Sequence, residues 1–125
     1  MRRDELYITD IFKAARAISR FIGGMDNAQF LNPAEDLIQS AILQKLTIIG
    51  EASARLTDEF KHRAPDIEWR KIIGLRNVAV HAYFTIDWHV VWSAATEDVP
   101  ALVNTLRSVE PLLEFAYDDT LKRDR

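Results

Sequence analysis

The stretch that decides the fold is "NPAEDLIQSAILQKLTIIGEASARL", residues Asn32 to Leu56. It opens on a helix start signal, because asparagine is a strong N-cap, proline suits the first helical position and Glu35 follows three residues after the cap. The polar residues then recur at steps of three or four and form one narrow stripe: Asp36, Ser40, Gln44, Thr47 and Glu51. Apolar residues cover most of the remaining circumference. The pattern predicts a long helix, straight or kinked, that continues to about Arg63 before Pro65.

Gly50 interrupts the apolar surface of this predicted helix. Glycine in a helix interior costs about 1 kcal/mol relative to alanine. A neighbouring helix or backbone segment that approaches closely at this position would explain the glycine. The apolar residues between Leu37 and Ala52 exceed what one buried face needs, so we expect burial on more than one side, by the chain's own bundle or by a second subunit.

The sequence on both sides of this stretch is helical as well. Pro65-Asp66 offers a stop and a fresh N-cap, so a third helix is predicted from about Ile67 into "GLRNVAVHAY", residues 74–83. Near the N-terminus, an apolar stripe predicts a helix from about Asp4 to Ile22, which Gly23-Gly24 ends. The members of that stripe are Tyr7, Ile11, Ala14, Ile18 and Phe21.

The last third of the chain predicts two more helices. Residues 84–87 form a break, and Asp87 can cap a short helix that carries Trp88, Val91 and Trp92. A final helix begins near Asp98, and the polar tail from about residue 118 is expected to fray. The predicted buried face of this last helix is Leu102, Leu106, Val109, Leu113 and Ala116. With no strand alternation, repeat or linker, the prediction is one all-α domain over residues 1–125, an up-and-down bundle of four to five helices.

Composition excludes several classes of function. The 125 residues contain no cysteine, which removes disulfides, thiolate metal sites and cysteine nucleophiles. The net charge of −3 implies no polyanion-binding tail, and no signal peptide or membrane span is recognisable. Asp58 and His62 lie one helical turn apart without a third ligand nearby in sequence, so neither a metal site nor another cofactor is predicted. We expect a protein of the cytoplasm.

Basic residues are spread unevenly along the chain. From Arg55 to Arg76 there are six basic and four acidic residues, whereas from Asn77 to Leu121 there are one and seven. An anionic partner would favour the middle of the chain, although such runs are most often solvated surface. The candidate RNA-binding residues are three on one face of the first helix and two in the third: Lys13, Arg16, Arg20, Arg70 and Lys71.

The segment "GLRNVAVHAY" carries four polar side chains among small and apolar ones. At about 100° per residue, Tyr83 lies within about 20° of Arg76, and Asn77 and His81 lie about 100° and 140° round from it. All four therefore share one sector of a helix. A purely structural interpretation is open, in which Arg76 pairs with a carboxylate such as Glu51 and the histidine is hydrogen-bonded within the fold.

The chemical interpretation of the same residues is RNA cleavage. Histidine can exchange a proton near neutral pH, and the arginine fork matches phosphate oxygens and stabilises charge that develops on phosphorus. Both suit attack of a 2′-hydroxyl on the adjacent phosphate without a metal. One histidine per chain gives only one proton-transfer group, which is few for this reaction. A symmetric dimer with two such helices across a cleft would supply two histidines.

These residues resemble a known family. "RNVAVHAY" matches the R-N-x3-H-x-Y pattern of HEPN-domain proteins of the HepT type, the toxin partners of minimal nucleotidyltransferase antitoxins. Leu75 stands where a methionine often precedes the arginine. Three further stretches resemble the family in the family order: "IIGEASARL" (Ile48 to Leu56), "DIEWRKIIGLRN" (Asp66 to Asn77) and "DVPALVNTL" (Asp98 to Leu106). The resemblance covers roughly residues 5 to 115, and this extended pattern is more specific than R-x4-H alone.

The resemblance implies a helical-bundle homodimer that acts as a metal-independent endoribonuclease. It puts Arg76 and His81 at the catalytic positions, Asn77 at a supporting position, and Tyr83 where the partner nucleotidyltransferase attaches AMP and silences the toxin. Tyr83 is projected to the Arg76 side, so added phosphates would occupy the anion site and block RNA. Two alternatives stay open: a non-catalytic HEPN module that binds nucleotide, RNA or a partner, and a purely structural helical dimerisation domain.

Overall fold

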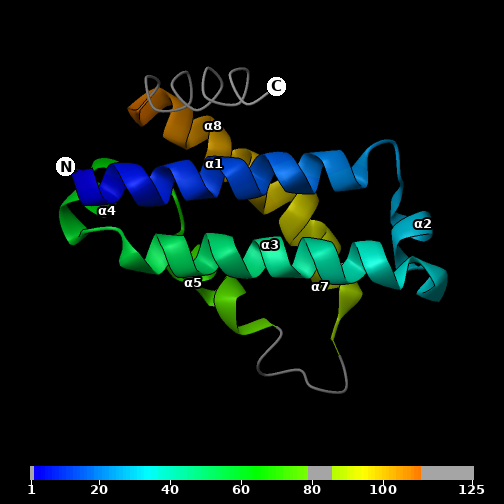
Figure 1. The fold of residues 1–125 in the computed structure, drawn as a ribbon. Helices are drawn as coiled ribbons and strands as arrows, with labels where there is room; N and C mark the ends of the chain where they lie inside the picture. Colours follow the sequence, from blue (N-terminus) through cyan, green and yellow to red (C-terminus); the bar gives the residue numbers. More distant parts are fainter. Residues whose placement is uncertain (1, 79–85, 111–125) are drawn as a thin grey trace.

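The chain forms an all-α bundle, as its sequence predicts. The computed structural model describes residues 2–78 and 86–110, and this part of the chain contains helices and no strands. Two long helices, α1 (Arg2–Ile22) and α3 (Asp36–Arg55), run antiparallel to each other (Figure 1). In the described residues, no helix is long and apolar enough to cross a membrane.

Local chemistry explains the boundaries of α1. Asp4 and Glu5 in the first turn and Arg20 in the last turn each interact favourably with the helix dipole. Gly23 follows the helix with a φ of 52°, a left-handed conformation that glycine adopts without strain. The predicted apolar stripe faces the core, with three members buried and two half-buried: Ile11, Ala14, Ile18, Tyr7 and Phe21.

A short helix that the sequence analysis did not predict, α2 (Asn27–Leu31), leads from α1 towards α3. A reciprocal capping box starts it: Asp26 Oδ1 accepts a hydrogen bond from Gln29 N, and Asp26 N donates to Gln29 Oε1, both at 2.8 Å. Phe30 of α2 is fully buried, and two tryptophan rings pack on it at centroid distances of 5.0 and 6.1 Å. The link between the two long helices therefore contributes to the core.

The long central helix starts one turn later than predicted. Asn32 does act as a cap, but of the 3₁₀ turn η1 (Pro33–Glu35), and α3 begins at Asp36. The buried Gln39 ties this region together, because its Nε2 donates to the carbonyl oxygen of Phe30 at 2.8 Å. The position of α3 is thus fixed against α2 through a buried polar contact.

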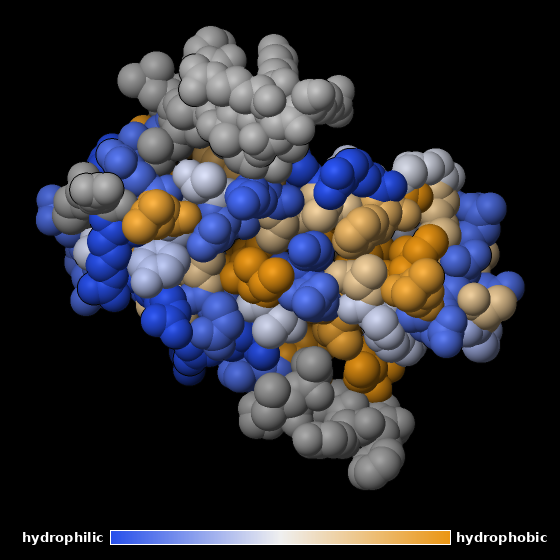
Figure 2. All heavy atoms as spheres, viewed as in Figure 1, coloured by the Kyte–Doolittle hydropathy of each residue, from blue (hydrophilic) through white to orange (hydrophobic). Residues whose placement is uncertain are grey.

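One face of α3 is open to solvent. Four members of the predicted polar stripe are exposed and one is half-buried: Asp36, Ser40, Gln44, Glu51 and Thr47. The expected burial on more than one side holds only in part in the single chain, since Leu37 is 80% exposed and Ile38, Ala41 and Ile48 are half-buried. Figure 2 shows hydrophobic side chains among polar ones on this face of α1 and α3.

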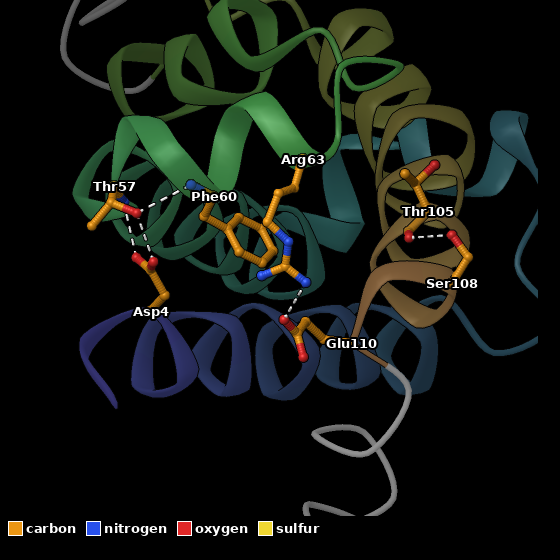
Figure 3. Close-up of polar contacts among 7 residues, drawn as sticks. All are labelled: Asp4, Thr57, Phe60, Arg63, Thr105, Ser108 and Glu110. Atoms are coloured by element: carbon orange, nitrogen blue, oxygen red, sulfur yellow. Dashed lines mark hydrogen bonds and ion pairs between the residues drawn. The ribbon is translucent and has the colours of Figure 1, made fainter. Parts of the chain in front are cut away.

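The single long helix predicted here is two helices. α3 ends at Arg55, the next two residues are extended, and α4 (Asp58–Arg63) follows. Thr57 explains the break, because its hydroxyl caps α4 by accepting from Phe60 N at 3.2 Å. The buried Asp4 of α1 holds the same turn, accepting from Thr57 N at 2.9 Å and from Thr57 Oγ1 at 2.7 Å (Figure 3).

Five helical segments complete the described chain: α5 (Trp69–Gly74), η2 (Leu75–Asn77), α7 (Trp88–Ser93), η3 (Ala94–Asp98) and α8 (Val99–Val109). Asp87 caps α7 as predicted, since its Oδ1 accepts from His89 N at 3.0 Å. α8 begins at Val99, which confirms the predicted start near Asp98, and the π-helical η3 joins it directly to α7. On the predicted buried face of α8, Leu102 and Leu106 are buried and Val109 is half-buried. The other two predicted members, Leu113 and Ala116, and the tail from about residue 118 lie outside the described residues.

Candidate active site

The predicted catalytic arginine lies in η2, a 3₁₀ turn that packs directly on α3. The contact point on α3 is the buried Gly50. A Cβ built on Gly50 would lie 3.0 Å from Arg76 Cβ and 3.1 Å from Arg76 Cα, and closer still to Arg76 N. Such distances are too short for a real side chain, so only glycine lets the two backbones meet here. The close approach predicted at Gly50 is confirmed, and its partner is the candidate arginine.

The Arg76 side chain is half-buried. Within residues 2–78 and 86–110, no group forms a hydrogen bond or ion pair with its guanidinium. Glu51, the carboxylate considered as its partner, is exposed and does not pair with it. A half-buried guanidinium presents its donors where charge is screened less than in bulk water, so Arg76 is suited to bind an anion such as a phosphate oxygen.

The other three motif residues are placed only in part. Asn77 is exposed at the end of η2, whereas His81 and Tyr83 lie outside the described residues. An α-helix advances about 100° per residue, as assumed for the four polar side chains above, but a 3₁₀ turn advances about 120° per residue. Asn77 is therefore rotated about 20° further from Arg76 than an α-helix would place it. The relation of these two residues to His81 and Tyr83 stays a prediction.

Three of the candidate RNA-binding residues lie on α1. Lys13 and Arg20 are exposed, and Arg16 is half-buried. Arg16 also lines a groove of about 430 Å³ between α1 and α8, together with Arg107 and apolar residues such as Val103. All three side chains are thus at least partly accessible on α1, and their binding of RNA stays a prediction.

The other two candidate RNA-binding residues lie on α5, which packs on α3. Arg70 is exposed, but Lys71 Nζ forms an ion pair with Asp98 Oδ1 at 3.2 Å. The hydrogen bond from Lys71 to Asp98 and the charge of Asp98 raise the pKa of Lys71 above its usual 10.5. An RNA phosphate at Lys71 would have to compete with this carboxylate, so Arg70 is better placed than Lys71 to meet a ligand.

The three tryptophans pack against the core. Trp69 Nε1 donates to two backbone carbonyl oxygens in and after α4, at 3.2 and 3.1 Å. Trp88 and Trp92 pack on the buried Phe30. All three rings are only half-buried, but their contacts are to the protein interior and give no sign of a base-stacking surface.

Two further histidines and Asp58 are exposed in the described part of the chain. Asp58 and His62 are exposed on α4, and His89 is exposed on α7. Across the described residues, no group of three or more histidine, aspartate or glutamate side chains is arranged to hold a metal ion.

The sequence analysis did not include Gly50 of α3 in the site, although Gly50 contacts Arg76. One turn further along α3, the Ser53 side chain is completely buried, and its hydroxyl has no hydrogen-bond partner in the described structure. The available signal for Gly50 was the glycine itself in an otherwise strong helix. Its partner could not be read from the sequence, because the contact joins segments far apart in the chain.

The fold and this arginine define an all-α bundle in which a half-buried guanidinium lies in a turn packed on the central helix. Residues 11–109 match the protein-family model described as "Ribonuclease HepT-like", which covers well over half of the chain. The chain therefore belongs to the HepT-like ribonuclease family.

Named relatives agree with this assignment. The chain is 36% identical over 96 residues to "Probable ribonuclease HepT" of Thermococcus cleftensis, covering 77% of this chain and 86% of that one. It is 34% identical over 102 residues to "Putative RNase MJ1380" of Methanocaldococcus jannaschii, covering 81% and 92% of the two chains. No solved structure was found to match the chain. The family and these relatives support a ribonuclease function.

Proposed function

We propose that the chain is a metal-independent endoribonuclease toxin of a toxin–antitoxin pair, which cleaves RNA in a cleft between two copies of the chain in the cytoplasm. The observation that carries the proposal is Arg76, a half-buried arginine with no partner in the described structure, in a chain of the HepT-like ribonuclease family. Arg76 and His81 are the proposed catalytic residues, and Asn77 supports them.

The proposed reaction needs two proton-transfer groups. The imidazole of His81 takes the proton of the 2′-hydroxyl, the 2′-oxygen bonds to the adjacent phosphorus, and the bond from phosphorus to the 5′-oxygen breaks. The leaving 5′-oxygen takes a proton from the imidazolium of the partner subunit's His81. Arg76 donates hydrogen bonds to the non-bridging oxygens, where negative charge grows in the transition state. The products are a 2′,3′-cyclic phosphate and a 5′-hydroxyl.

The test of catalysis is cleavage of a fluorescent RNA in the presence of EDTA. We expect Arg76→Ala and His81→Ala to slow cleavage at least about 100-fold while the proteins stay folded. The matched controls are Arg55→Ala and His89→Ala, which remove the same side-chain types at exposed positions outside the motif. Normal cleavage by folded His81→Ala would remove this histidine from the mechanism. If the wild-type chain binds RNA without cleaving it, the chain is instead a non-catalytic binding module.

The proposed homodimer is supported by the exposed apolar side chains of the α1–α3 face (Figure 2). Leu37 of α3 is 80% exposed, and the half-buried Ala41 and Ile48 follow it on the same face of that helix. Leu6 of α1 is 63% exposed. Single exposed apolar residues are ordinary, but a row along one helix face is typical of an interface. A second copy of the chain would bury this row.

The dimer is tested by sedimentation and by activity. We expect Leu37→Glu to give a monomer that cleaves RNA poorly, because a charge at this position opposes burial. Val90→Glu is the matched control, since Val90 is also an exposed apolar residue, 51% exposed, but on α7. A dimeric and active Leu37→Glu variant would exclude this face as the interface.

The proposed off-switch is AMP attached to Tyr83 by a partner nucleotidyltransferase. Its phosphates would compete with RNA for the Arg76 guanidinium. Incubation of the chain with the cognate nucleotidyltransferase and ATP should add multiples of the AMP mass to the peptide that contains Tyr83. Tyr83→Phe should cleave RNA but resist modification. A label on either of the other two tyrosines would contradict this role.

A further inference from the structure

The contact between α3 and η2 does more than bury apolar surface. It joins the backbone of Gly50 to the backbone of the residue that carries the candidate catalytic guanidinium. We infer that Gly50 is a positioning residue, which sets the distance of η2 from α3 and so the place of the Arg76 guanidinium in the RNA-cleavage site. This inference rests on the proposed function, because it gives Gly50 a role through Arg76.

The physical argument is steric. The Cβ of an alanine at position 50 would meet three atoms of Arg76, two of them in the main chain, rather than the end of a flexible side chain. Main-chain atoms in a packed turn cannot rotate aside, so the whole of η2 must move away from α3. Ordinary van der Waals contact begins near 3.4 Å, which requires a shift on the order of 1 Å.

A shift of this size matters for catalysis more than for folding. A misplacement on the order of 1 Å can slow an enzyme about 100-fold, because the donors of the guanidinium no longer meet the oxygens that gain charge in the transition state. We expect the fold to absorb the shift, because η2 is a turn of only three residues. The side chains that α3 contributes to the core, such as Leu46 and Ile49, are at other positions of α3 than Gly50 and are unchanged by the substitution. Glycine at position 50 therefore lowers the helix propensity of α3 but allows η2 to lie close enough to α3 to place the arginine.

The chain offers a matched control at Gly74. This residue lies in the same segment, two positions before Arg76, and an added Cβ there would meet nothing within 4 Å. Its φ of −60° and ψ of −20° suit alanine. Gly50→Ala and Gly74→Ala therefore add the same methyl group, one against η2 and one into open space.

The experiment measures RNA cleavage by both variants well below their unfolding temperatures, with rates divided by the folded fraction from circular dichroism. We expect Gly74→Ala to cleave within threefold of the wild-type rate. We expect Gly50→Ala to lose about 100-fold, mainly in kcat with little change in KM, because a displaced guanidinium fails chiefly in the transition state. A protein that was merely less stable would show the wild-type kcat per folded molecule.

Each other outcome overturns the inference. A folded Gly50→Ala variant that cleaves within threefold of the wild-type rate has no misplaced arginine. A variant that stays unfolded even in trimethylamine N-oxide, which favours compact states, would show that the contact supports the whole fold. A crystal structure of Gly50→Ala tests the displacement without any assay of cleavage. If η2 has not moved from α3, Gly50 does not position Arg76. A wild-type chain that cleaves no RNA refutes the proposed function and the catalytic role given to Gly50 with it, and the crystal structure then still shows whether Gly50 sets the position of η2.

Discussion

The strongest test of the fold is the removal of Asp4. This aspartate is only 2% exposed, and its carboxylate accepts hydrogen bonds from the backbone N and the hydroxyl of Thr57 (Figure 3). Thr57 in turn caps α4 by accepting from Phe60 N. One side chain of α1 therefore holds the turn that separates α3 from α4, and Asp4→Ala should loosen that turn and destabilise the whole chain.

The expected loss of stability can be worked from the two bonds. Hydrogen bonds to a charged acceptor contribute about 1.5–3 kcal/mol each. Both bonds from Thr57 are only partly buried, so water can replace part of what is lost, and we take the lower value for each. Asp4→Ala should thus lower the free energy of unfolding by about 3 kcal/mol, or the Tm by about 10 °C. Asp4→Asn, whose amide can accept only through its oxygen, should lose about half as much.

The measurement is urea unfolding followed by circular dichroism. Glu5→Ala is the matched control, because Glu5 is an exposed carboxylate in the same first turn of α1. It removes the same interaction with the helix dipole without touching Thr57, and should change stability by less than about 0.5 kcal/mol. If Asp4→Ala and Glu5→Ala lose the same amount, the bonds to Thr57 do not stabilise the fold.

Three further predictions concern polar groups elsewhere. Gln39→Leu should lower the free energy of unfolding by about 1–2 kcal/mol in a urea titration, because it leaves a buried carbonyl oxygen without its donor. Ser53→Ala should leave stability unchanged or raise it by up to about 1 kcal/mol, since the buried hydroxyl has no partner in the described structure; a loss above 1 kcal/mol would point to a bond that the structure lacks. The Lys71 pair with Asp98 should contribute stability that is complete below pH 10.5 and lost as the pH rises through the raised pKa of Lys71. An NMR titration of the Lys71 side chain should show this pKa falling in Asp98→Asn.

The sequence predicted the helices correctly where apolar residues recur at a regular helical spacing. It missed the helices whose N-cap residue lies within or next to such a stretch. The apolar stripe of α1 predicted its end at Ile22, because Gly23 gives an unambiguous stop, whereas the helix starts at Arg2, two residues before the predicted Asp4. The start of α4 was missed because the apolar pattern was followed across Thr57, although threonine before two acidic residues is a good N-cap signal. α2 was missed in the same way, since Asp26 and Gln29 carry the spacing of a capping box.

The sequence named the candidate site residues but could not give their geometry. Residue type and spacing singled out Arg76 and Asn77, the resemblance to the HepT type assigned their roles, and those roles stay predictions. Nothing in Leu75–Asn77 distinguishes a 3₁₀ turn from the α-helix that the sequence predicts. The turn lies against Gly50, and a local pattern cannot report a neighbour that comes from another part of the chain.

Two of the stretches that resemble the family meet in one structural unit. "IIGEASARL" contains Gly50 and "DIEWRKIIGLRN" contains Arg76, and the two segments meet at a backbone contact. If Gly50 acts through Arg76, the effects of changing both residues on cleavage should not add. Gly50→Ala/Arg76→Ala should then cleave RNA no more than about threefold slower than Arg76→Ala, because the position of a missing guanidinium is irrelevant. A further loss near 100-fold in the folded double variant would show that Gly50 serves the reaction by some route other than Arg76.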